Sequence, residues 1–249
     1  MASVQRLVSV LGSTGSIGVN TLDVIARHPD RFAVFGLAAH SSVQALLDQC
    51  LAFRPRYAVM MDEAAAESLR AKLPPDSETE VLQGEAGLQH IASAPQVDTV
   101  MAAIVGAAGL PSALAAAQAG KTLLLANKES LVCAGGLLMQ TALRHGARLL
   151  PVDSEHSAVF QGLVGEDMAA VERIVITASG GAFRDWPLAD LKTATVAQAS
   201  SHPNWDMGKK KSVDRFFAPP FRCFHAPSLR TPGMECKNLA IGVSCEWPH

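Results

Sequence analysis

A chain of 249 residues is long enough for one large domain or two small ones. Its formal net charge of -2 and pI of about 6.4 exclude the basic surface expected of a nucleic-acid-binding protein. No apolar run is long enough to cross a bilayer, and residues 1–10 lack the apolar stretch of a signal peptide, so we expect a cytoplasmic protein without a membrane partner. The five cysteines have no regular spacing, and we expect small buried hydrophobes in a reducing compartment, including Cys50 and Cys133.

Strand-like and helix-like segments alternate up to about residue 180. The pattern predicts strands over Arg6–Leu11, Phe32–Ala39, Tyr57–Met61, Thr99–Val105, Thr122–Ala126, Ala147–Val152 and Arg173–Ala178. It predicts helices between them over Ser16–Arg27, Val43–Phe53, Glu63–Leu73, Pro111–Ala119 and Leu131–His145. This alternation predicts an α/β fold with a doubly wound, Rossmann-like parallel sheet.

Three glycines, Gly12, Gly15 and Gly18, stand between the first strand and the first helix. Gly12 permits a tight turn, Gly15 lets a phosphate approach the backbone, and Gly18 allows the helix and strand to pack closely. The helix then presents free N–H groups and the positive end of its dipole. The segment therefore predicts a site for the pyrophosphate of a dinucleotide, with a plain strand-to-helix turn as the alternative.

The residues after the second strand indicate which dinucleotide binds. NAD-binding sites usually place an Asp or Glu there for the ribose hydroxyls, whereas this chain has His40, Ser41 and Ser42. A carboxylate would repel a 2′-phosphate, while His and Ser can donate hydrogen bonds to it. The segment favours NADP(H) over NAD(H), although Ser42 could equally act only as the N-cap of the next helix.

Polar residues also follow later strands. Asp153 and Glu155 lie two positions apart, and in an extended chain both would point to the same side and could share Mg²⁺ or Mn²⁺. A solvated loop with a helix N-cap is the alternative. Lys128 could hold a substrate oxygen or phosphate, or simply begin a helix capped near Ser130. The segment around Ser179 suits a small phosphate.

Five segments occur in the same order in a known family: GSTGSIG, LANKESLV, PVDSEHSA, TASGGAFRD and HPNWDMGKK. From about Arg6 to Asp214 the chain resembles the 1-deoxy-D-xylulose 5-phosphate reductoisomerases. The resemblance implies an NADP-dependent oxidoreductase and isomerase of non-mevalonate isoprene biosynthesis. Such an enzyme rearranges 1-deoxy-D-xylulose 5-phosphate to an aldehyde and reduces it with NADPH to 2-C-methyl-D-erythritol 4-phosphate. A divalent cation, Mg²⁺ or Mn²⁺, acts as Lewis acid.

The same resemblance assigns roles to individual positions. The implied cofactor contacts are Thr14, Gly15, Ser16, Ile17, Asn127, Glu129 and Gly208. The implied metal ligands are Asp153 and Glu155. The implied substrate contacts are Lys128, Ser154, Glu155, Ser179 and His202, of which Lys128, Glu155 and His202 are the expected catalytic residues. His202 and Trp205 resemble a lid that closes over the phosphosugar. Family members are commonly homodimers, so a second copy of the chain is the implied protein partner.

The chain departs from the family pattern in two places. Many members carry a Gly-Lys-Asn-like stretch where this chain has His40-Ser41-Ser42, which bears on the 2′-phosphate contacts. After Asp214 the family continues to an Asn-Lys-Gly-Leu-Glu segment that supplies substrate-phosphate ligands and a third metal carboxylate. Residues 215–249 instead are rich in Phe, Cys and Pro, which is typical of a reading-frame shift or a truncated gene. A zinc site at Cys223, His225, Cys236 and Cys245 fits no known ligand spacing.

We therefore expect an NADPH-binding domain over residues 1–150, an incomplete α/β catalytic and metal-binding domain over residues 151–214, and a disordered or non-native tail over residues 215–249. The catalytic assignment has two alternatives. The first is a non-catalytic NADPH-binding fragment of the same enzyme. The second is a different NADP-dependent dehydrogenase of doubly wound fold, which would need no divalent metal.

Overall fold

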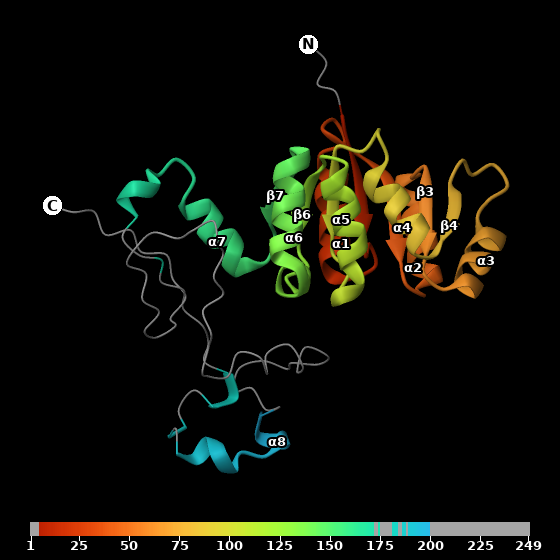
Figure 1. Ribbon diagram of the computed structural model, residues 1–249. Helices are drawn as coiled ribbons and strands as arrows, with labels where there is room; N and C mark the ends of the chain where they lie inside the picture. The colour runs from red at the N-terminus through yellow and green to blue at the C-terminus, as the bar shows by residue number, and fades with distance from the viewer. Residues whose placement is uncertain (1–4, 172–173, 175–180, 184–185, 188, 200–249) are drawn as a thin grey trace. The chain divides into compact units, whose positions relative to one another are not determined.

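Figure 1 shows the computed structural model, which describes residues 5–171, 174, 181–183, 186–187 and 189–199. The chain divides into two units, residues 1–157 and 158–249, and each is described by itself. The strand predicted over residues 173–178 lies almost entirely outside the described residues, as do the predicted site residues Ser179, His202 and Gly208.

The first unit is built on one seven-stranded sheet in which every neighbouring pair is parallel. The strands are β1 (Arg6–Leu11), β2 (Phe32–Ala39), β3 (Tyr57–Met60), β4 (Glu80–Gln83), β5 (Thr99–Ala102), β6 (Thr122–Leu125) and β7 (Arg148–Pro151). Their order across the sheet is β4-β3-β2-β1-β5-β6-β7, so the direction of winding reverses between β1 and β5. The predicted doubly wound α/β fold is confirmed.

Helices connect successive strands and cover both faces of the sheet (Figure 1). The α-helices are α1 (Ser16–Arg27), α2 (Val43–Phe53), α3 (Glu63–Lys72), α4 (Gly84–Ser93), α5 (Leu110–Gln118), α6 (Glu129–His145), α7 (Ser154–Gly162) and α8 (Val196–Ala199). Short 3-10 turns are η1 (Ala107–Gly109), η2 (Met168–Ala170), η3 (Gly181–Phe183) and η4 (Asp190–Thr193). Within the described residues, no helix has both the length and the apolar composition needed to cross a membrane.

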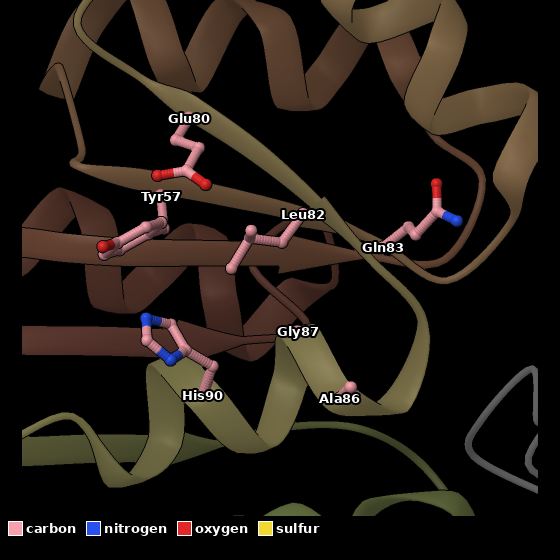
Figure 2. A pocket seen from close by; sticks show the side chains of 7 residues that line it. All are labelled: Tyr57, Glu80, Leu82, Gln83, Ala86, Gly87 and His90. Carbon is pink, nitrogen blue, oxygen red and sulfur yellow. The ribbon is translucent and has the colours of Figure 1, made fainter.

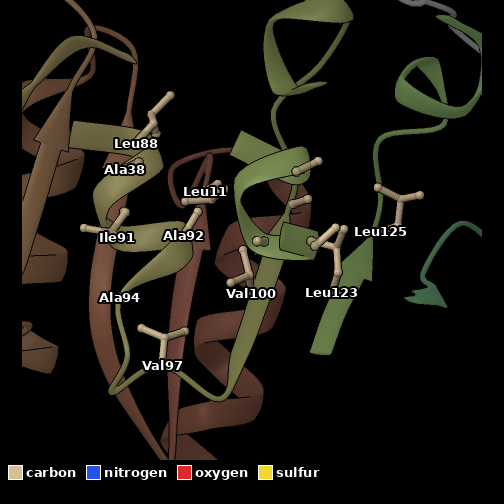
Figure 3. Close-up of a cluster of buried hydrophobic side chains, with 14 of the residues drawn as sticks. Leu11, Ala38, Leu88, Ile91, Ala92, Ala94, Val97, Val100, Leu123 and Leu125 are labelled. Atoms are coloured by element: carbon tan, nitrogen blue, oxygen red, sulfur yellow. The ribbon is translucent and has the colours of Figure 1, made fainter. Parts of the chain in front are cut away.

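Two buried clusters lie on the two faces of the sheet. Side chains of α4, α5 and α6 pack on one face, and Figure 3 shows Leu88, Ile91 and Leu123 in that cluster. Side chains of α1, α2 and α3 pack on the other face. Because both faces are covered, the central strands are mostly apolar, and all four residues of β5 are buried. The three layers hold the carboxyl ends of the strands at one edge of the sheet.

The predicted elements agree with the structure where the apolar pattern is long, and differ where it is short. The β4–α4 unit was not predicted, because β4 buries only Val81 and α4 contains two glycines, Gly84 and Gly87. The strand predicted over Thr99–Val105 ends at Ala102. Cys50 is buried as expected, but the expectation for Cys133 is wrong, since its position on α6 is exposed.

We predict that Leu123→Ala destabilises the protein by about 2–5 kcal/mol, because Leu123 is fully buried and its truncation leaves a cavity. Leu143→Ala is the matched control, since Leu143 on α6 is 84% exposed and should change stability by less than about 0.5 kcal/mol. Urea denaturation followed by circular dichroism measures both variants. Equal losses for the two would contradict this description of the core.

Candidate active site

The turn after β1 is fixed by backbone contacts to both neighbouring strands. The N–H groups of Gly12 and Ser13 donate to the carbonyl oxygen of Ala38 in β2 at 3.0 and 2.8 Å. Gly12 has a φ of +85°, and a Cβ there would lie 2.8 Å from the carbonyl oxygen of Ala103, just after β5. Glycine is therefore needed at position 12 for its backbone conformation and for this close approach.

The start of α1 packs directly on this turn. A Cβ on Gly18 would lie 2.5 Å from the Cα of Ser13, so only glycine fits where the helix crosses the turn. From α2, the side-chain Nε2 of Gln49 donates to the carbonyl oxygen of Ser13 at 2.9 Å. Contacts from β2, α1, α2 and the segment after β5 thus hold the turn in this conformation.

The N-terminus of α1 is left open. Gly15 is its N-cap residue, no side chain of the described residues caps it, and its first turn holds no acidic residue. Gly15, Ser16 and Ile17 are exposed and Thr14 is half-buried. Unpaired N–H groups at the positive end of a helix dipole form an anion site. The four residues predicted to hold the pyrophosphate therefore surround a helix end that suits it.

The N-terminus of α2, next along the chain, has the same character. Its N-cap residue is Ser42, whose hydroxyl makes no capping hydrogen bond, and its first turn holds no acidic residue. His40 and Ser41 are exposed just before it. A role for the Ser42 hydroxyl in capping α2 is therefore not seen. This second open helix end fits a phosphate group beside the end of β2.

Helix α3, unlike α1 and α2, is capped by a side chain of the protein. Its N-cap residue Asp62 accepts a hydrogen bond from the N–H of Ala65 at 2.8 Å, and Glu63 adds a negative charge to its first turn. Both features satisfy the helix dipole from within the protein. Anion binding is therefore favoured at α1 and α2, and disfavoured at α3.

The residues predicted after β6 lie at the beginning of α6. Asn127 is only 2% exposed, and its side chain bonds to protein backbone at every polar atom: Nδ2 to the carbonyl oxygens of Ile104 and Gly106, and Oδ1 to the N–H of Ser130. Lys128 and Glu129 are half-buried beside it. Ser130 is fully buried, and its hydroxyl has no hydrogen-bond partner in the described part of the chain.

Asp153 follows β7, but the extended geometry predicted for residues 153–155 is wrong. Helix α7 already begins at Ser154, because Asp153 caps it by accepting a hydrogen bond from the N–H of His156 at 3.0 Å. The idea that Asp153 and Glu155 face the same side of an extended strand therefore does not apply. Their pairing as metal ligands rests on the family resemblance.

The carboxylate of Asp153 is held by positive and donor groups. The Nδ1 of His156 lies 2.7 Å from each carboxylate oxygen. Partial burial alone raises the pKa of Asp153, but the hydrogen bonds from His156 and the nearby positive charges of His156 and Lys128 outweigh it, so the pKa lies below its ordinary value. The ionised carboxylate of Asp153 fits a hard cation. The ammonium of Lys128 near it fits an anionic substrate group.

The structure thus brings Asp153 and Lys128 together across the carboxyl ends of β7 and β6. His156 was not predicted as a site residue, although its spacing of three from a carboxylate at a helix start is a recognisable capping signal. Among the described residues, no three His, Cys, Asp or Glu side chains gather into a metal site. Ser154 is exposed in the first turn of α7.

A groove of about 350 Å³ lies at the opposite edge of the sheet, beside β4 and α4 (Figure 2). Its lining residues are Tyr57, Glu80, Leu82, Gln83, Ala86, Gly87 and His90. The His90 ring meets the Tyr57 ring edge-on, with centroids 4.9 Å apart. None of the predicted site residues lines the groove, so it is separate from the candidate site.

Comparison with known proteins identifies relatives of this arrangement. The model of the family described as 1-deoxy-D-xylulose 5-phosphate reductoisomerase matches residues 8–135, and that of its C-terminal domain matches residues 149–216. The reductoisomerase of Saccharophagus degradans is 56% identical over 215 residues, covering 84% of this chain and 55% of the relative. That of Dechloromonas aromatica is 54% identical over 220 residues, covering 86% and 55%.

Solved structures agree. The reductoisomerase of Zymomonas mobilis in complex with NADPH superposes with a TM-score of 0.74 at 46% identity, covering 80% of this chain and 52% of that one. A DOX-P reductoisomerase in complex with NADPH, fosmidomycin and magnesium superposes with a TM-score of 0.70 at 42% identity, covering 84% and 54%. The chain spans about half the length of the curated relatives it matches.

We predict that Gly18→Ala destabilises the protein by about 1–3 kcal/mol, because the added methyl meets backbone atoms that cannot move aside. Gly15→Ala is the matched control, since its methyl would lie 3.4 Å from the carbonyl oxygen of Gly12, an ordinary contact. Chemical denaturation without ligand compares the two. If Gly18→Ala were as stable as the control, the packing of α1 on the turn would be wrong.

We predict a pH-dependent stability difference between the wild type and Asp153→Asn, measured by urea denaturation without divalent metal. Because the folded-state pKa is lowered, the ionised carboxylate stabilises the fold above the unfolded-state value of about 3.9. This advantage is lost as the pH falls through the lower folded-state pKa. Asp153→Ala, which also removes the cap, should cost about 0.5–2 kcal/mol more at all pH values. A difference independent of pH between 7 and 2 would contradict the assignment.

Proposed function

The chain belongs to the 1-deoxy-D-xylulose 5-phosphate reductoisomerase family, and we propose that it carries the NADPH-binding part of an enzyme with that activity. The reaction is the NADPH- and divalent-metal-dependent isomerisation and reduction of 1-deoxy-D-xylulose 5-phosphate to 2-C-methyl-D-erythritol 4-phosphate. The observation that carries the proposal is the open N-terminus of α1 behind the Gly12 turn, in a chain whose solved relatives hold NADPH.

Two open helix ends support NADPH as the dinucleotide. The pyrophosphate is assigned to Thr14, Gly15, Ser16 and Ile17 at the start of α1. The 2′-phosphate is assigned to His40, Ser41 and Ser42, which lead into the uncapped N-terminus of α2. Ordinary NAD(H) lacks this phosphate and would leave the second helix end without a charge partner. Asn127, Glu129 and Gly208 are assigned to the cofactor on the resemblance.

The metal and substrate sites are proposed on the same grounds. Asp153 and Glu155 are the proposed ligands of Mg²⁺ or Mn²⁺, and a DOX-P reductoisomerase has been solved with magnesium. When bound, the cation supplies Lewis-acid stabilisation of charge that develops on substrate oxygens. Lys128 is half-buried, and its positive charge lies close enough to Asp153 to lower the pKa of that carboxyl, which supports Lys128 as the proposed partner of an anionic substrate oxygen beside the metal site.

The remaining proposed contacts come from the resemblance alone. Ser154, Ser179 and His202 are assigned to the phosphosugar, with Lys128, Glu155 and His202 as catalytic residues. We also propose a cytoplasmic location and a homodimer. Because the chain spans about half the length of its relatives, a non-catalytic NADPH-binding role is the second candidate. It shares the cofactor site and differs only in turnover.

We predict that the chain binds NADPH at least about tenfold more tightly than NADH, a difference of roughly 1.4 kcal/mol from the 2′-phosphate. Isothermal titration with both dinucleotides measures it. Replacing His40 and Ser41 with alanine should remove most of this preference, whereas His28→Ala, an exposed histidine at the end of α1, should leave it unchanged. Absence of NADPH binding by the wild type would sink the proposal.

The two candidate functions separate in an assay of NADPH oxidation with 1-deoxy-D-xylulose 5-phosphate and Mg²⁺ or Mn²⁺. We expect turnover near background for residues 1–249 alone, since the resemblance supplies two metal carboxylates, Asp153 and Glu155. Binding of NADPH without turnover supports the non-catalytic role for this chain. Robust turnover that Glu155→Gln abolishes would instead assign it the complete reaction.

A further inference from the structure

Asn127 has the contacts of a structural clamp. One amide nitrogen donates to two backbone carbonyl oxygens, of Ile104 and of Gly106 (the latter at 2.8 Å), and the amide oxygen accepts from the N–H of Ser130 at 3.1 Å. At 2% exposure, little of the side chain is open to a ligand. Buried amides with all groups paired hold their partners in one arrangement. Asn127 thus ties the loop after β5 to the first turn of α6.

The clamp holds the backbone on both sides of Val105. Its two acceptor carbonyls, from Ile104 and Gly106, belong to the residues on either side of Val105. Both carbonyls accept from one nitrogen that is buried, and the intervening side chain of Val105 is 81% exposed. Gly106 has a φ of +80°, which glycine adopts without strain. A β-branched apolar residue is held in solvent at the carboxyl edge of the sheet.

Gly109 leaves the space that the clamp occupies. A Cβ at this position would overlap the Nδ2 of Asn127 and lie 3.0 Å from the carbonyl oxygen of Ile104. Any side chain at position 109 would therefore displace the amide from its two acceptors. Asn127 and Gly109 form one unit, and the conformation of the loop depends on both.

The loop lies where the second half of a dinucleotide must pass. A Cβ on Gly12 would contact Ala103 and Ile104, so the phosphate turn and this loop abut between β1 and β5. Dinucleotides bind across this reversal point of the sheet. In the proposed placement, with the adenosine end beside β2 and the pyrophosphate at α1, the nicotinamide end would extend across the strand order toward β5 and β6.

We propose that Asn127 is a positioning residue that acts through Val105: by clamping the loop it presents the Val105 side chain as an apolar contact for the nicotinamide half of the bound cofactor. The inference rests on the proposed function, because it takes NADPH as the ligand. It assigns Val105 a binding role, and it gives Asn127 a role in binding that requires no side-chain contact with the cofactor. Gly109 shares that role by leaving the clamp its space.

The test uses two probes on the full chain. NADPH spans both halves of the site, while 2′,5′-ADP has the adenosine, the 2′-phosphate and one further phosphate but no nicotinamide. Val105→Ala should raise the dissociation constant of NADPH roughly five- to tenfold and leave that of 2′,5′-ADP unchanged. Because Val105 is exposed, the thermal midpoint should not move.

The role of the clamp is tested by combining Asn127→Asp with Val105→Ala. Asn127→Asp keeps an oxygen for the N–H of Ser130 but sets a second oxygen against two carbonyls, so it releases the loop selectively. Asn127→Asp should weaken NADPH binding by at least as much as Val105→Ala does. In the Asn127→Asp background, Val105→Ala should have no further effect on the dissociation constant of NADPH. Gly109→Ala should behave like Asn127→Asp. Ser112→Ala, which removes a buried hydrogen bond to Gly109 at 3.1 Å, controls for general loss of stability.

Each outcome of these measurements either supports the proposal or overturns it. A selective loss of NADPH affinity, with the effect of Val105→Ala absent in the Asn127→Asp background, supports the proposal. Full additivity of the two substitutions, or equal weakening of NADPH and 2′,5′-ADP, would overturn it while leaving NADPH binding intact. If Asn127→Asp does not fold, an unchanged NADPH affinity in Val105→Ala still refutes the contact. If the wild type binds 2′,5′-ADP and NADPH equally well, the proposed contact of Val105 is also refuted. If the wild type binds neither ligand, the proposed function itself is refuted.

Discussion

The close approach of two backbone segments, the turn after β1 and the first turn of α1, is the constraint on which the rest of the structure depends. Gly18 has no room for a methyl group against Ser13, and Gly12 has none against the carbonyl oxygen of Ala103. These contacts seat α1 on the sheet and fix the end of β1 between β2 and β5. Because the helix begins at the turn itself, its first N–H groups open directly onto the point where the sheet reverses its winding. A larger side chain at either glycine would separate the layers and close this opening.

The electrostatics of the edge follow from how each helix begins. Helices α1 and α2 begin without a capping side chain or an acidic residue in the first turn, whereas Asp62 and Glu63 satisfy α3 and Asp153 caps α7. Positive helix ends are therefore left for a ligand where β1 and β2 finish, and α5 after β5 also begins without a capping side chain or an acidic residue in its first turn. Negative charge lies in the first turns of α3, α4 and α6, with Glu63, Glu85 and Glu129, and at Asp153 after β7. The phosphates of a dinucleotide match the open starts of α1 and α2.

The sequence predicted the elements from Arg6 to Phe53 with the observed bounds, because long apolar runs and helix periods agree there with glycine and proline signals. It did not predict β4 and α4: β4 buries a single residue, and α4 contains two glycines, although its buried residues Leu88, Ile91 and Ala92 keep a helical spacing. Asp153 was placed in extended chain because a carboxylate after a strand fits a ligand as well as a helix cap, and only the local backbone decides between them. The partners of Asn127 were beyond prediction, since Ile104 and Gly106 contribute backbone oxygens from more than twenty residues away.

Within the short segment Asn127-Lys128-Glu129-Ser130, some residues face the protein interior and another lies near the candidate site, a difference that the motif alone does not reveal. Asn127 and Ser130 turn inward, one paired at every polar atom and the other with a buried hydroxyl, while Lys128 lies near the carboxylate of Asp153. In the role proposed for Asn127, a residue serves cofactor binding without touching the cofactor, by holding the loop that carries an exposed neighbour. The loop after β5, the turn after β1 and the start of α6 are joined by contacts within the first unit. The residues proposed to bind the dinucleotide therefore lie chiefly in this unit, and those proposed for the phosphosugar include residues that follow β7.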